Sequence, residues 1–393
     1  MLIDNDLDEL QKRESALTYI EVRLKKKGRH NLFDLTGLSG GFLLKKDDLE
    51  LLETYVGPAV FEKMLDKYGK DHLGGEKVLG FNRTSAGILA TILALVKKDS
   101  TVVHYLPELP SHPSIPRSTK LVGAEYLEFD RLDDFHLPEN TSLVIITGST
   151  MDHKVIPVEE FQIIIKETHK SSTSPPLMVD DASGARLRTA IFKQPSAWDL
   201  GADLIITSTD KLMKGPRGGL MAGKSSLISK IKSKAHQYGL EAQGPILAGM
   251  VRALQEFHPE NISGSLEKKR ELLRYLKREW EGFKETPTGV MISAADIALE
   301  MDKRNIKTSL TDRDLAFLWA MLLLKGYGII TIPAVGMPGA SPTLRIDLTS
   351  ADAQKLGIEE LNHILRDSFK KLLQIAPSPQ QAESVLFKGS ENR

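Results

Sequence analysis

The chain has 393 residues, a length that suits two or three domains of ordinary size. Hydrophobic residues make up 41% and charged residues 26%, so the composition is that of a globular protein and excludes disordered and fibrous classes. Lysine and arginine number 52, as do aspartate and glutamate, and this balance argues against a surface that binds nucleic acid over its whole extent. The chain has no cysteine, which excludes disulfides, thiolate metal sites, iron–sulfur clusters and a persulfide carried on the enzyme.

The sequence predicts a cytoplasmic protein without a membrane partner. The N-terminus is charged from Asp4 onward and lacks the apolar core of a signal peptide. The longest apolar run, 315–324, has ten residues, whereas roughly 20 are needed to cross a bilayer. The histidines show neither H-x-x-x-H nor H-E-x-x-H spacing, so we expect no metal site.

Between about residues 77 and 225, short β-branched runs alternate with helical patterns. The expected strands are 101–105, 142–147, 177–180, 203–208 and 219–222, and the expected helices are 86–97, 158–170 and 195–200. Runs such as VIIT and LIIT are apolar at every position, which indicates strands buried on both faces of a mainly parallel sheet. The alternation of strands and helices predicts an α/β fold.

The pattern changes after about residue 245. We expect, in chain order, a helix over 266–284, a strand-rich stretch over 289–299, a helix over 312–325, strands over 328–335 and 343–348, and a helix over 359–373. The whole chain then divides into an N-terminal arm with helices (1–60), a large α/β domain (61–250), a smaller α+β domain (251–375) and a flexible tail (376–393).

Two acidic residues stand where an apolar strand ends. Asp180 and Asp181 follow Leu177-Met178-Val179 and precede a turn of small residues. Ligands of open α/β sheets bind beyond the carboxyl ends of the strands, so these acids are candidates for a binding site. The structural alternative is an aspartate that caps the following turn or helix.

A lysine follows the next buried strand. Lys211 comes after Ser208-Thr209-Asp210 and before a glycine-rich stretch. Desolvation at such a position lowers the pKa of a lysine and makes the neutral amine available to form a Schiff base. Taken alone, the segment is more typical of a surface lysine in a turn.

Small and hydroxyl residues open an apolar helix further upstream. Thr84, Ser85, Ala86 and Gly87 precede the run ILATILALV. Backbone N–H groups at a helix start, together with the positive end of the helix dipole, bind phosphate. The alternative is an ordinary serine or threonine N-cap.

Together, these three segments match the needs of pyridoxal 5′-phosphate (PLP). This cofactor requires a lysine for its aldehyde, an acid that keeps the pyridine nitrogen protonated, and a phosphate site. The order along the chain is phosphate site, acid, and then a lysine 31 residues after Asp180, as in the fold-type-I PLP enzymes.

A competing motif lies just downstream. The segment Gly218–Ser225 satisfies the P-loop pattern G-x-x-x-x-G-K-[ST]. Its interior, Leu220-Met221-Ala222, is apolar and predicts a buried strand rather than a loop that wraps phosphate. We therefore do not expect a P-loop nucleotide site.

The chain resembles bacterial selenocysteine synthase (L-seryl-tRNA(Sec) selenium transferase) in three segments, Asp180-Asp181-Ala182-Ser183-Gly184, Ser208–Leu212 and Gly215-Pro216. The chain resembles more closely the archaeal PLP-dependent homologues of that enzyme, which have no settled reaction. The resemblance implies PLP as cofactor, the aspartate-aminotransferase-like fold type I, and a homodimer or higher homo-oligomer.

The resemblance also implies a role for each matching residue. Lys211 is the Schiff-base lysine and Asp180 the partner of the pyridine nitrogen. Ala182 lies beneath the ring, and Ser208 assists Thr84, Ser85, Ala86 and Gly87 in binding the phosphate. His112 stacks on the other face of the ring, unless it is a loop histidine bonded to backbone.

Three further positions complete the implied site. Where the family usually has an asparagine for the phenolic oxygen of the cofactor, this chain offers Ser149, Thr150 or Asp152. Arg345, on an apolar strand, is expected to bind the substrate carboxylate, with a salt bridge to Asp347 or another neighbour as the alternative. Arg83 or Arg217 is expected to reach a ligand in a neighbouring subunit.

We thus expect a PLP-dependent transferase or lyase that acts on an amino acid or aminoacyl substrate through Lys211. One alternative is a lyase or aminotransferase acting on a small free amino acid, and another is a non-catalytic PLP-binding carrier or regulator. A tRNA-borne substrate is less expected, because an ester to tRNA leaves no free carboxylate for Arg345 and the chain has no net positive charge.

Overall fold

The computed structural model describes residues 1–388, which form two compact units. Residues 39–259 make up the large unit, and residues 1–38 join the described residues from 260 onward in the C-terminal unit. The sequence-based boundaries near 60 and 250 therefore differ from the observed ones. The first 38 residues are not a separate arm, because α1 (Asp6–Lys27) packs against helices from the other end of the chain.

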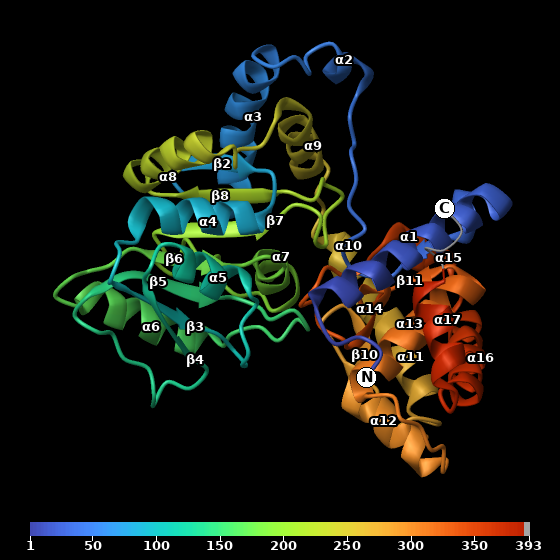
Figure 1. Ribbon diagram of the computed structural model, residues 1–393. Coiled ribbons are helices and arrows are strands. Elements are labelled where there is room, and N and C mark those ends of the chain that lie inside the picture. The colour runs from blue at the N-terminus through green and yellow to red at the C-terminus, as the bar shows by residue number, and fades with distance from the viewer. Residues whose placement is uncertain (389–393) are drawn as a thin grey trace. The chain divides into compact units, whose positions relative to one another are not determined.

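A seven-stranded sheet forms the centre of the large unit (Figure 1). Its strands are β2 (Lys77–Phe81), β3 (Thr101–Tyr105), β4 (Glu125–Phe129), β5 (Thr141–Thr147), β6 (Leu177–Asp180), β7 (Leu204–Ser208) and β8 (Gly219–Gly223). They lie in the order β2-β8-β7-β6-β5-β3-β4, and every neighbouring pair is parallel except the two that β8 makes. The predicted α/β class with a mainly parallel sheet is confirmed.

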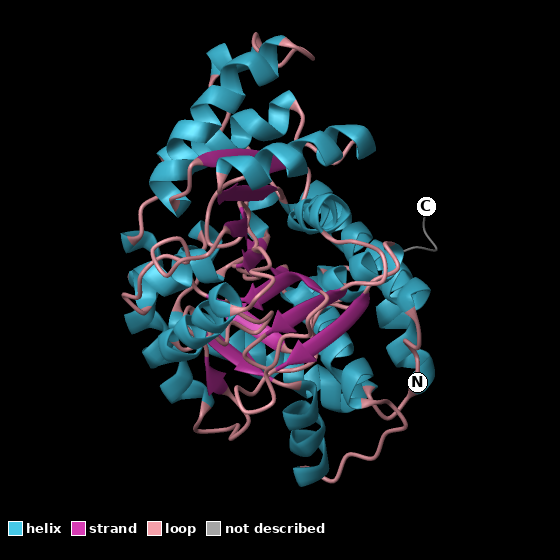
Figure 2. Ribbon diagram, turned by 90° about the vertical axis from the view of Figure 1, so that its left-hand side faces the viewer, coloured by secondary structure: helices cyan, strands magenta, loops and turns pink. Residues whose placement is uncertain are grey.

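Helices cover both faces of this sheet (Figure 2). On one face lie α3 (Val56–Leu73), α6 (Val158–Lys170) and α9 (Gly244–Gln255), and on the other lie α4 (Thr84–Leu95), α5 (Ser114–Leu121) and α8 (Ser225–Tyr238). Along β5, Val144 and Ile146 pack with the first set, whereas Leu143 and Ile145 pack with the second. This two-sided burial explains why the strand is apolar at successive positions.

The remaining elements of the large unit are short. They are α2 (Lys46–Leu49), α7 (Gly184–Arg186) and a π-helix, η2 (Leu187–Ile191). The expected helix over 195–200 is not present, since residues 197–200 form only turns. The P-loop pattern also has no structural counterpart here, because Gly219–Gly223 is the buried strand β8 and Lys224 Nζ lies 2.5 Å from Asp203 Oδ1.

The C-terminal unit is mostly helical. Besides α1 it contains η1 (Arg29–Asn31), α10 (Glu260–Ser263), α11 (Ser265–Leu276), α12 (Ala294–Lys303), α13 (Asp312–Tyr327), α14 (Ile332–Val335), α15 (Ala351–Lys355), α16 (Ile358–Ile375) and α17 (Pro379–Phe387). A small antiparallel sheet has the order β12 (Leu344–Asp347), β10 (Gly289–Ile292), β9 (Lys284–Glu285), and β1 (Phe33–Asp34) pairs in parallel with β11 (Ile329–Ile330).

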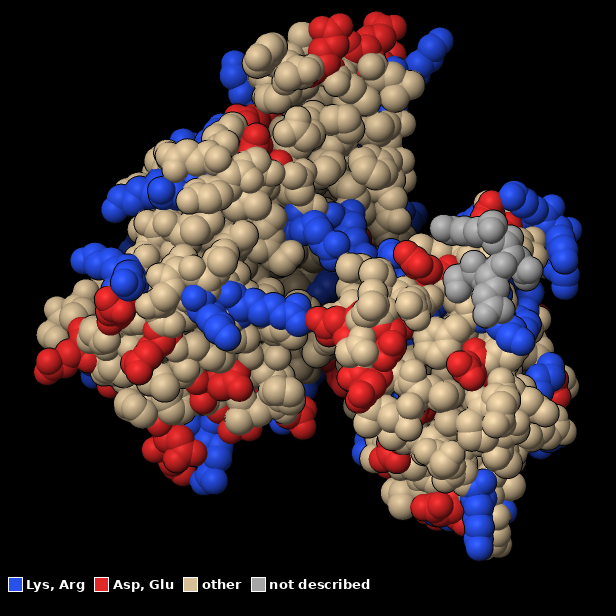
Figure 3. Space-filling view, in the orientation of Figure 1, with Lys and Arg blue, Asp and Glu red and all other residues tan. Residues whose placement is uncertain are grey.

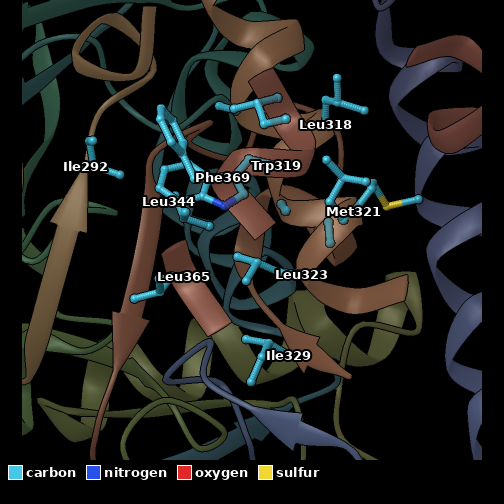
Figure 4. Packing of buried hydrophobic residues seen from close by; sticks show 14 of the residues in the cluster. Ile292, Leu318, Trp319, Met321, Leu323, Ile329, Leu344, Leu365 and Phe369 are labelled. Carbon is cyan, nitrogen blue, oxygen red and sulfur yellow. The ribbon is translucent and has the colours of Figure 1, made fainter. Parts of the chain in front are cut away.

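The core of this unit surrounds α13, whose Trp319 packs against Phe369 with ring centroids 4.9 Å apart (Figure 4). The indole Nε1 donates a 2.8 Å hydrogen bond to Ser368 Oγ, so its polar atom is satisfied inside the core. Leu344 of β12 and Leu365 of α16 belong to the same cluster, which ties the small sheet to the helices.

Several C-terminal elements differ from expectation. The strand-rich stretch over 289–299 stops at Ile292, because Ser293 Oγ accepts a hydrogen bond from Asp296 N and starts α12. The expected strand over 328–335 is only two residues long and turns into α14 at Pro333. The helix expected over 266–284 ends at Leu276.

The expected flexible tail over 376–393 is wrong for residues 379–387. They form α17, capped by Ser378 Oγ, and bury Ala382, Val385 and Leu386 against the unit core. The spacing of these apolar residues is that of one helix face. The rest of the expected tail, 389–393, lies outside the described residues. No helix in the described part of the chain is both long enough and apolar enough to span a membrane.

A buried lysine in α1 gives a prediction for the pH dependence of stability. Burial lowers the pKa of Lys12 from 10.5 to about 7, even though Glu9 acts in the opposite direction. The unfolded chain therefore binds more protons than the folded chain between these pH values, so this residue makes the free energy of unfolding rise with pH over that interval.

Lys12→Met should accordingly stabilise the protein more at about pH 7 than at about pH 10, because the variant has no buried amine to deprotonate. Urea unfolding at both pH values measures this difference. Lys25→Met, at an exposed position of the same helix, is the matched control. An equal effect of Lys12→Met at both pH values would contradict the prediction.

Candidate functional site

The two acids at the end of β6 have different environments. Asp181 is fully buried and paired with Arg188, whose Nε and Nη2 each lie 3.3 Å from a carboxylate oxygen. Gly148 and Gly184 fit closely around this carboxylate, since a Cβ on either residue would lie within 2.0 Å of Asp181 Oδ1. Asp181 is thus occupied by a structural ion pair that holds the turn after β6.

Asp180 lacks such a partner. Its Oδ1 is buried and accepts no hydrogen bond from any described residue. Burial raises the pKa of Asp180 to about 6, with a further contribution from Asp181, while the charge of Lys211 acts to lower it. A buried acceptor without a donor is costly, so this oxygen is suited to a ligand that brings an N–H group.

Lys211 stands in the loop that follows β7. Beside it, Ser208 Oγ donates to the carboxylate of Asp210, and Arg217 Nε lies 3.8 Å from Asp210 Oδ2. The next residue, Leu212, has a φ of 55°, an unfavourable conformation for a leucine that marks a constrained loop. The positive charge of Lys211 acts on the pKa values of both Asp180 and His112, so Lys211 lies within electrostatic reach of each.

The loop of Lys211 also packs against residues before α2. A Cβ on Gly40 would lie 2.1 Å from the carbonyl oxygen of Gly215 and 2.8 Å from Asp210 Cα. Only glycine permits this approach of the two backbones. The segment near residue 40 therefore helps to fix the loop.

His112 lies between β3 and α5. Its Nδ1 accepts a hydrogen bond from the backbone N–H of Ser114 (3.3 Å) and lies 3.0 Å from Ser114 Oγ. Desolvation of the ring by its surroundings, followed by the positive charges of Lys211, Arg117 and Arg83, lowers the pKa of His112 to about 4, although the residue keeps an exposed surface. The imidazole is therefore neutral at pH 7, with its proton on Nε2.

The candidate phosphate residues begin α4, directly after Arg83. That N-cap residue makes no side-chain capping hydrogen bond. In the sheet, Gly219 pairs with both Phe81 and Ser208, and a Cβ on Gly219 would lie 2.9 Å from Thr84 Cα. The fold thus brings the first turn of α4, with Thr84, Ser85, Ala86 and Gly87, close to Ser208 although they are far apart in sequence.

Ala182 joins the same sheet edge. Its carbonyl oxygen accepts hydrogen bonds from the N–H of Ser208 and from Thr207 Oγ1. In the adjacent strand, Thr147 pairs with Asp180, and Ser149, two residues later, is buried with its Oγ 3.0 Å from Ser183 Oγ. Of the other two candidates for the phenolic oxygen, Thr150 accepts from Lys154 N, and Asp152 lies in the same turn.

Two buried residues near the site were not predicted from the sequence. His104 in β3 lies 2.8 Å from Thr147 Oγ1 and 2.7 Å from the hydroxyl of Tyr126. That hydroxyl donates to Glu128 Oε2 at 2.7 Å and lies 2.8 Å from Ser111 Oγ. Burial lowers the pKa of His104 to about 3, so it is neutral. This chain of bonds connects the end of β5, beside Asp180, with the residue that precedes His112.

Arg186 is the second unpredicted residue. It is fully buried, and its Nη1 donates to the carbonyl oxygen of Ala182 (3.3 Å) and to Thr207 Oγ1 (3.2 Å). Burial lowers its pKa to about 10. For His104, the only signal is a polar residue inside an apolar strand, TVVHY, and no pattern in the sequence points to Arg186.

Arg345 belongs to the C-terminal unit. It lies in β12, almost fully buried, and its Nη2 donates a 2.9 Å hydrogen bond to the carbonyl oxygen of Thr36. The carboxylate of Asp347 accepts hydrogen bonds from Thr288 and Thr349. The large unit alone brings together the predicted residues Lys211, Asp180, His112, Ala182, Ser208, Thr84, Ser85, Ala86, Gly87, Arg83 and Arg217.

Comparison with known proteins places this arrangement in context. The family model described as L-seryl-tRNA selenium transferase matches residues 178–296, and the model described as UPF0425 C-terminal domain matches residues 279–357. An L-seryl-tRNA(Sec) selenium transferase of Pasteurella multocida is 25% identical over 217 residues, which cover 49% of this chain and 45% of that protein.

Solved structures share the fold at low sequence identity. A chain from the SepCysS–SepCysE N-terminal domain complex has a TM-score of 0.60 and 14% identity, covering 89% of this chain and 98% of its own. Serine palmitoyltransferase of Sphingomonas wittichii has a TM-score of 0.57 and 19% identity, covering 91% of this chain and 84% of its own. The fold is that of the fold-type-I PLP enzymes, as predicted.

Two archaeal proteins match over nearly the whole length. A UPF0425 pyridoxal phosphate-dependent protein of Methanosphaera stadtmanae is 48% identical, covering 97% of this chain and 99% of that protein. Another, of Methanothermobacter thermautotrophicus, is 50% identical, covering 94% of this chain and 95% of that protein. Identity of this extent shows that the chain belongs to the UPF0425 family of pyridoxal phosphate-dependent proteins, which is related to the selenocysteine synthases.

Proposed function

We propose that the large unit binds PLP at the carboxyl ends of β6 and β7 and that the protein is a PLP-dependent transferase or lyase acting on an amino acid. The observation that carries this proposal is the buried Oδ1 of Asp180, which has no donor among the described residues and lies within electrostatic reach of Lys211. A protonated pyridine nitrogen would supply the missing donor, so the residues fit the cofactor.

Each residue has a distinct task in this proposal. Lys211 would hold the cofactor through its amine, and the carboxylate of Asp180 would accept a hydrogen bond from the ring nitrogen. His112, with its neutral imidazole, and Ala182 would hold the ring of the cofactor. The first turn of α4 and Ser208 bind the phosphate through backbone N–H and hydroxyl groups.

When bound, PLP draws electrons from the α-carbon of an amino acid. The chain has to position that carbon and accept its proton. The neutral amine of Lys211 would be the group that accepts this proton. Arg345 binds the substrate carboxylate through its guanidinium.

The match to L-seryl-tRNA(Sec) selenium transferase supports elimination or replacement at the β-carbon of the substrate. A lyase or aminotransferase reaction on a small free amino acid is the second candidate, and it is favoured by an arginine suited to a free carboxylate. A PLP-binding carrier or regulator without catalysis would use the same cofactor residues. In each case we propose a cytoplasmic homodimer or higher homo-oligomer, with Arg83 or Arg217 reaching a ligand in the neighbouring subunit.

Attachment at Lys211 can be tested directly. Borohydride reduction of the protein loaded with PLP should fix the cofactor mass irreversibly on the peptide that contains Lys211, because reduction converts a carbon–nitrogen double bond into a stable amine. Peptide mass spectrometry measures the label. Lys211→Ala should lose it.

Lys214→Ala provides the matched control, since Lys214 is an exposed lysine of the same loop. This variant should be labelled as well as the wild type. Label on any lysine other than Lys211 in the wild-type protein would refute the assignment.

Asp180→Asn tests the contact with the ring. The loss of a charged acceptor should weaken PLP binding by about 10- to 100-fold, because a hydrogen bond to a charged group is worth about 1.5–3 kcal/mol. In the wild type, protonation of Asp180 below its pKa of about 6 should also weaken binding as pH falls, because cofactor binding favours the ionised carboxylate. Fluorescence titration with PLP over pH measures both effects. A variant with wild-type affinity and the same acid limb would rule out the contact.

Free amino acids distinguish the candidate reactions. If they are substrates, a panel of them should give a change in cofactor absorbance with at least one member, and Arg345→Gln should weaken that response by about 10-fold or more while PLP stays bound. The spectra are recorded as titrations. An unchanged amino-acid affinity in Arg345→Gln would exclude the carboxylate role, and a panel without any response would favour a tRNA-borne substrate or a carrier.

A further inference from the structure

Arg345 differs from the charged residues at the surface of its unit. Lysine, arginine, aspartate and glutamate side chains are scattered over the visible surface of the C-terminal unit (Figure 3), whereas Arg345 is only 4% exposed. Its Nη2 donates the 2.9 Å hydrogen bond to the carbonyl oxygen of Thr36. A guanidinium is a rigid planar fork, so an acceptor that holds one of its nitrogens also limits the direction of the others. The position of the Thr36 carbonyl is therefore part of what aims Arg345.

The hydroxyl of Thr36 fixes the backbone on both sides of this carbonyl. Thr36 Oγ1 donates to Asp34 Oδ1 at 2.6 Å and accepts a hydrogen bond from the N–H of Leu38 at 2.9 Å. Asp34 Oδ1 also accepts from the N–H of Thr36 at 3.0 Å, so the aspartate and the threonine close a local turn. Thr36 is 3% exposed, and water therefore cannot readily replace these bonds.

The turn is also attached to the strand that carries Arg345. The N–H of Asp347 donates to the carbonyl oxygen of Leu35 at 2.9 Å. Gly37 adopts a φ of 72°, which favours glycine, and a Cβ on this residue would lie 2.8 Å from Asp347 Oδ2. The residues directly before and after Thr36 thus both contact β12, so Thr36 keeps a fixed register with Arg345.

The tripeptide Asp-Leu-Thr occurs a second time in the same unit, at residues 347–349. There, too, the aspartate Oδ1 accepts hydrogen bonds from the N–H and the Oγ1 of the threonine two positions later. The two turns differ in the carbonyl of the threonine. That of Thr36 accepts from Arg345, whereas Thr349 accepts no hydrogen bond from Arg345 within the described part of the chain.

We propose that Thr36, supported by Asp34, is a positioning residue that directs the guanidinium of Arg345 toward the substrate carboxylate and so selects amino acids over substrates without a free α-carboxylate. This inference rests on the carboxylate role proposed above for Arg345. Thr36 acts through Arg345 and not on the substrate itself. The preference for a carboxylate should therefore depend on a hydroxyl that is one residue removed from the ligand.

The preference for a carboxylate can be measured in the full-length protein loaded with PLP. The probes are the common L-amino acids and their carboxamides, each titrated by the change in cofactor absorbance. A carboxamide keeps the amine and the side chain but lacks the charge that a guanidinium binds. Thr36→Val should lower the preference for acid over amide by about fivefold or more, because the buried turn loses two hydrogen bonds. Thr36→Ser keeps the hydroxyl and should retain the wild-type preference.

Asp34 provides a second pair of variants that does not alter Thr36. Asp34→Ala removes the acceptor of the turn and should lower the preference as Thr36→Val does. Asp34→Asn keeps an acceptor oxygen and should behave like the wild type. Equal losses in Asp34→Ala and Asp34→Asn would show that the hydrogen bonds of the turn are not what matters, and would overturn the inference.

Thr349→Val is the matched control, because it removes the same hydroxyl from the second Asp-Leu-Thr turn. Its melting temperature should fall about as much as that of Thr36→Val, but its preference for the acid should stay that of the wild type. The double variant Arg345→Gln/Thr36→Val should lose no more preference than Arg345→Gln alone, since the hydroxyl acts through the guanidinium. Additive losses would indicate a general structural defect and would overturn the positioning role.

The outcomes separate this inference from the proposed function. A panel without any response, or a preference that Arg345→Gln leaves unchanged, would remove the carboxylate role and the inference with it. If Arg345→Gln abolishes the preference while Thr36→Val changes it no more than Thr349→Val does, the positioning role alone is overturned and the role of Arg345 stands.

Discussion

Burial of the Asp180 carboxylate disfavours its charged form, and the nearby ammonium of Lys211 favours it. Both groups are delivered by neighbouring parallel strands, so the register of β6 and β7 sets the distance between them. The rest of the large unit maintains this arrangement. Arg188 neutralises Asp181, which leaves Asp180 as the carboxylate available to a ligand. Arg186 donates a hydrogen bond to the carbonyl oxygen of Ala182 and so helps to hold the turn after β6.

Much of the central sheet follows from the sequence, because five of its strands are short apolar runs buried on both faces. The two strands that were not predicted, β2 and β4, have local sequence features that explain why. β4 is an edge strand whose glutamates, Glu125 and Glu128, interrupt its apolar pattern, and β2 contains Gly80. In the C-terminal unit, the period-based strand assignments failed at Ser293 and Pro333, where single residues with helix-starting chemistry override the apolar pattern.

The candidate site, too, could be predicted from the sequence only in part. The order of the motifs was enough to predict that Asp180 and Lys211 lie near each other, since strands of a parallel sheet end at one edge. The sequence could not tell which of the two acids is already paired. That depends on Arg188, seven residues after Asp181, and on the π-helix that turns its side chain back. Nor could it reveal the bonds from Thr147 through His104 to Tyr126, which join three strands.

The large unit is an insertion between α1 and the helices that α1 contacts. During synthesis, α1 leaves the ribosome before the large unit, but α13, α14 and α17 are made more than 280 residues after its end. The large unit has local connections of its own and can condense in the meantime. Helix α1 is therefore made before the large unit but meets its packing partners only after it, and closure of this very long loop makes docking of α1 a late event in the folding of the chain.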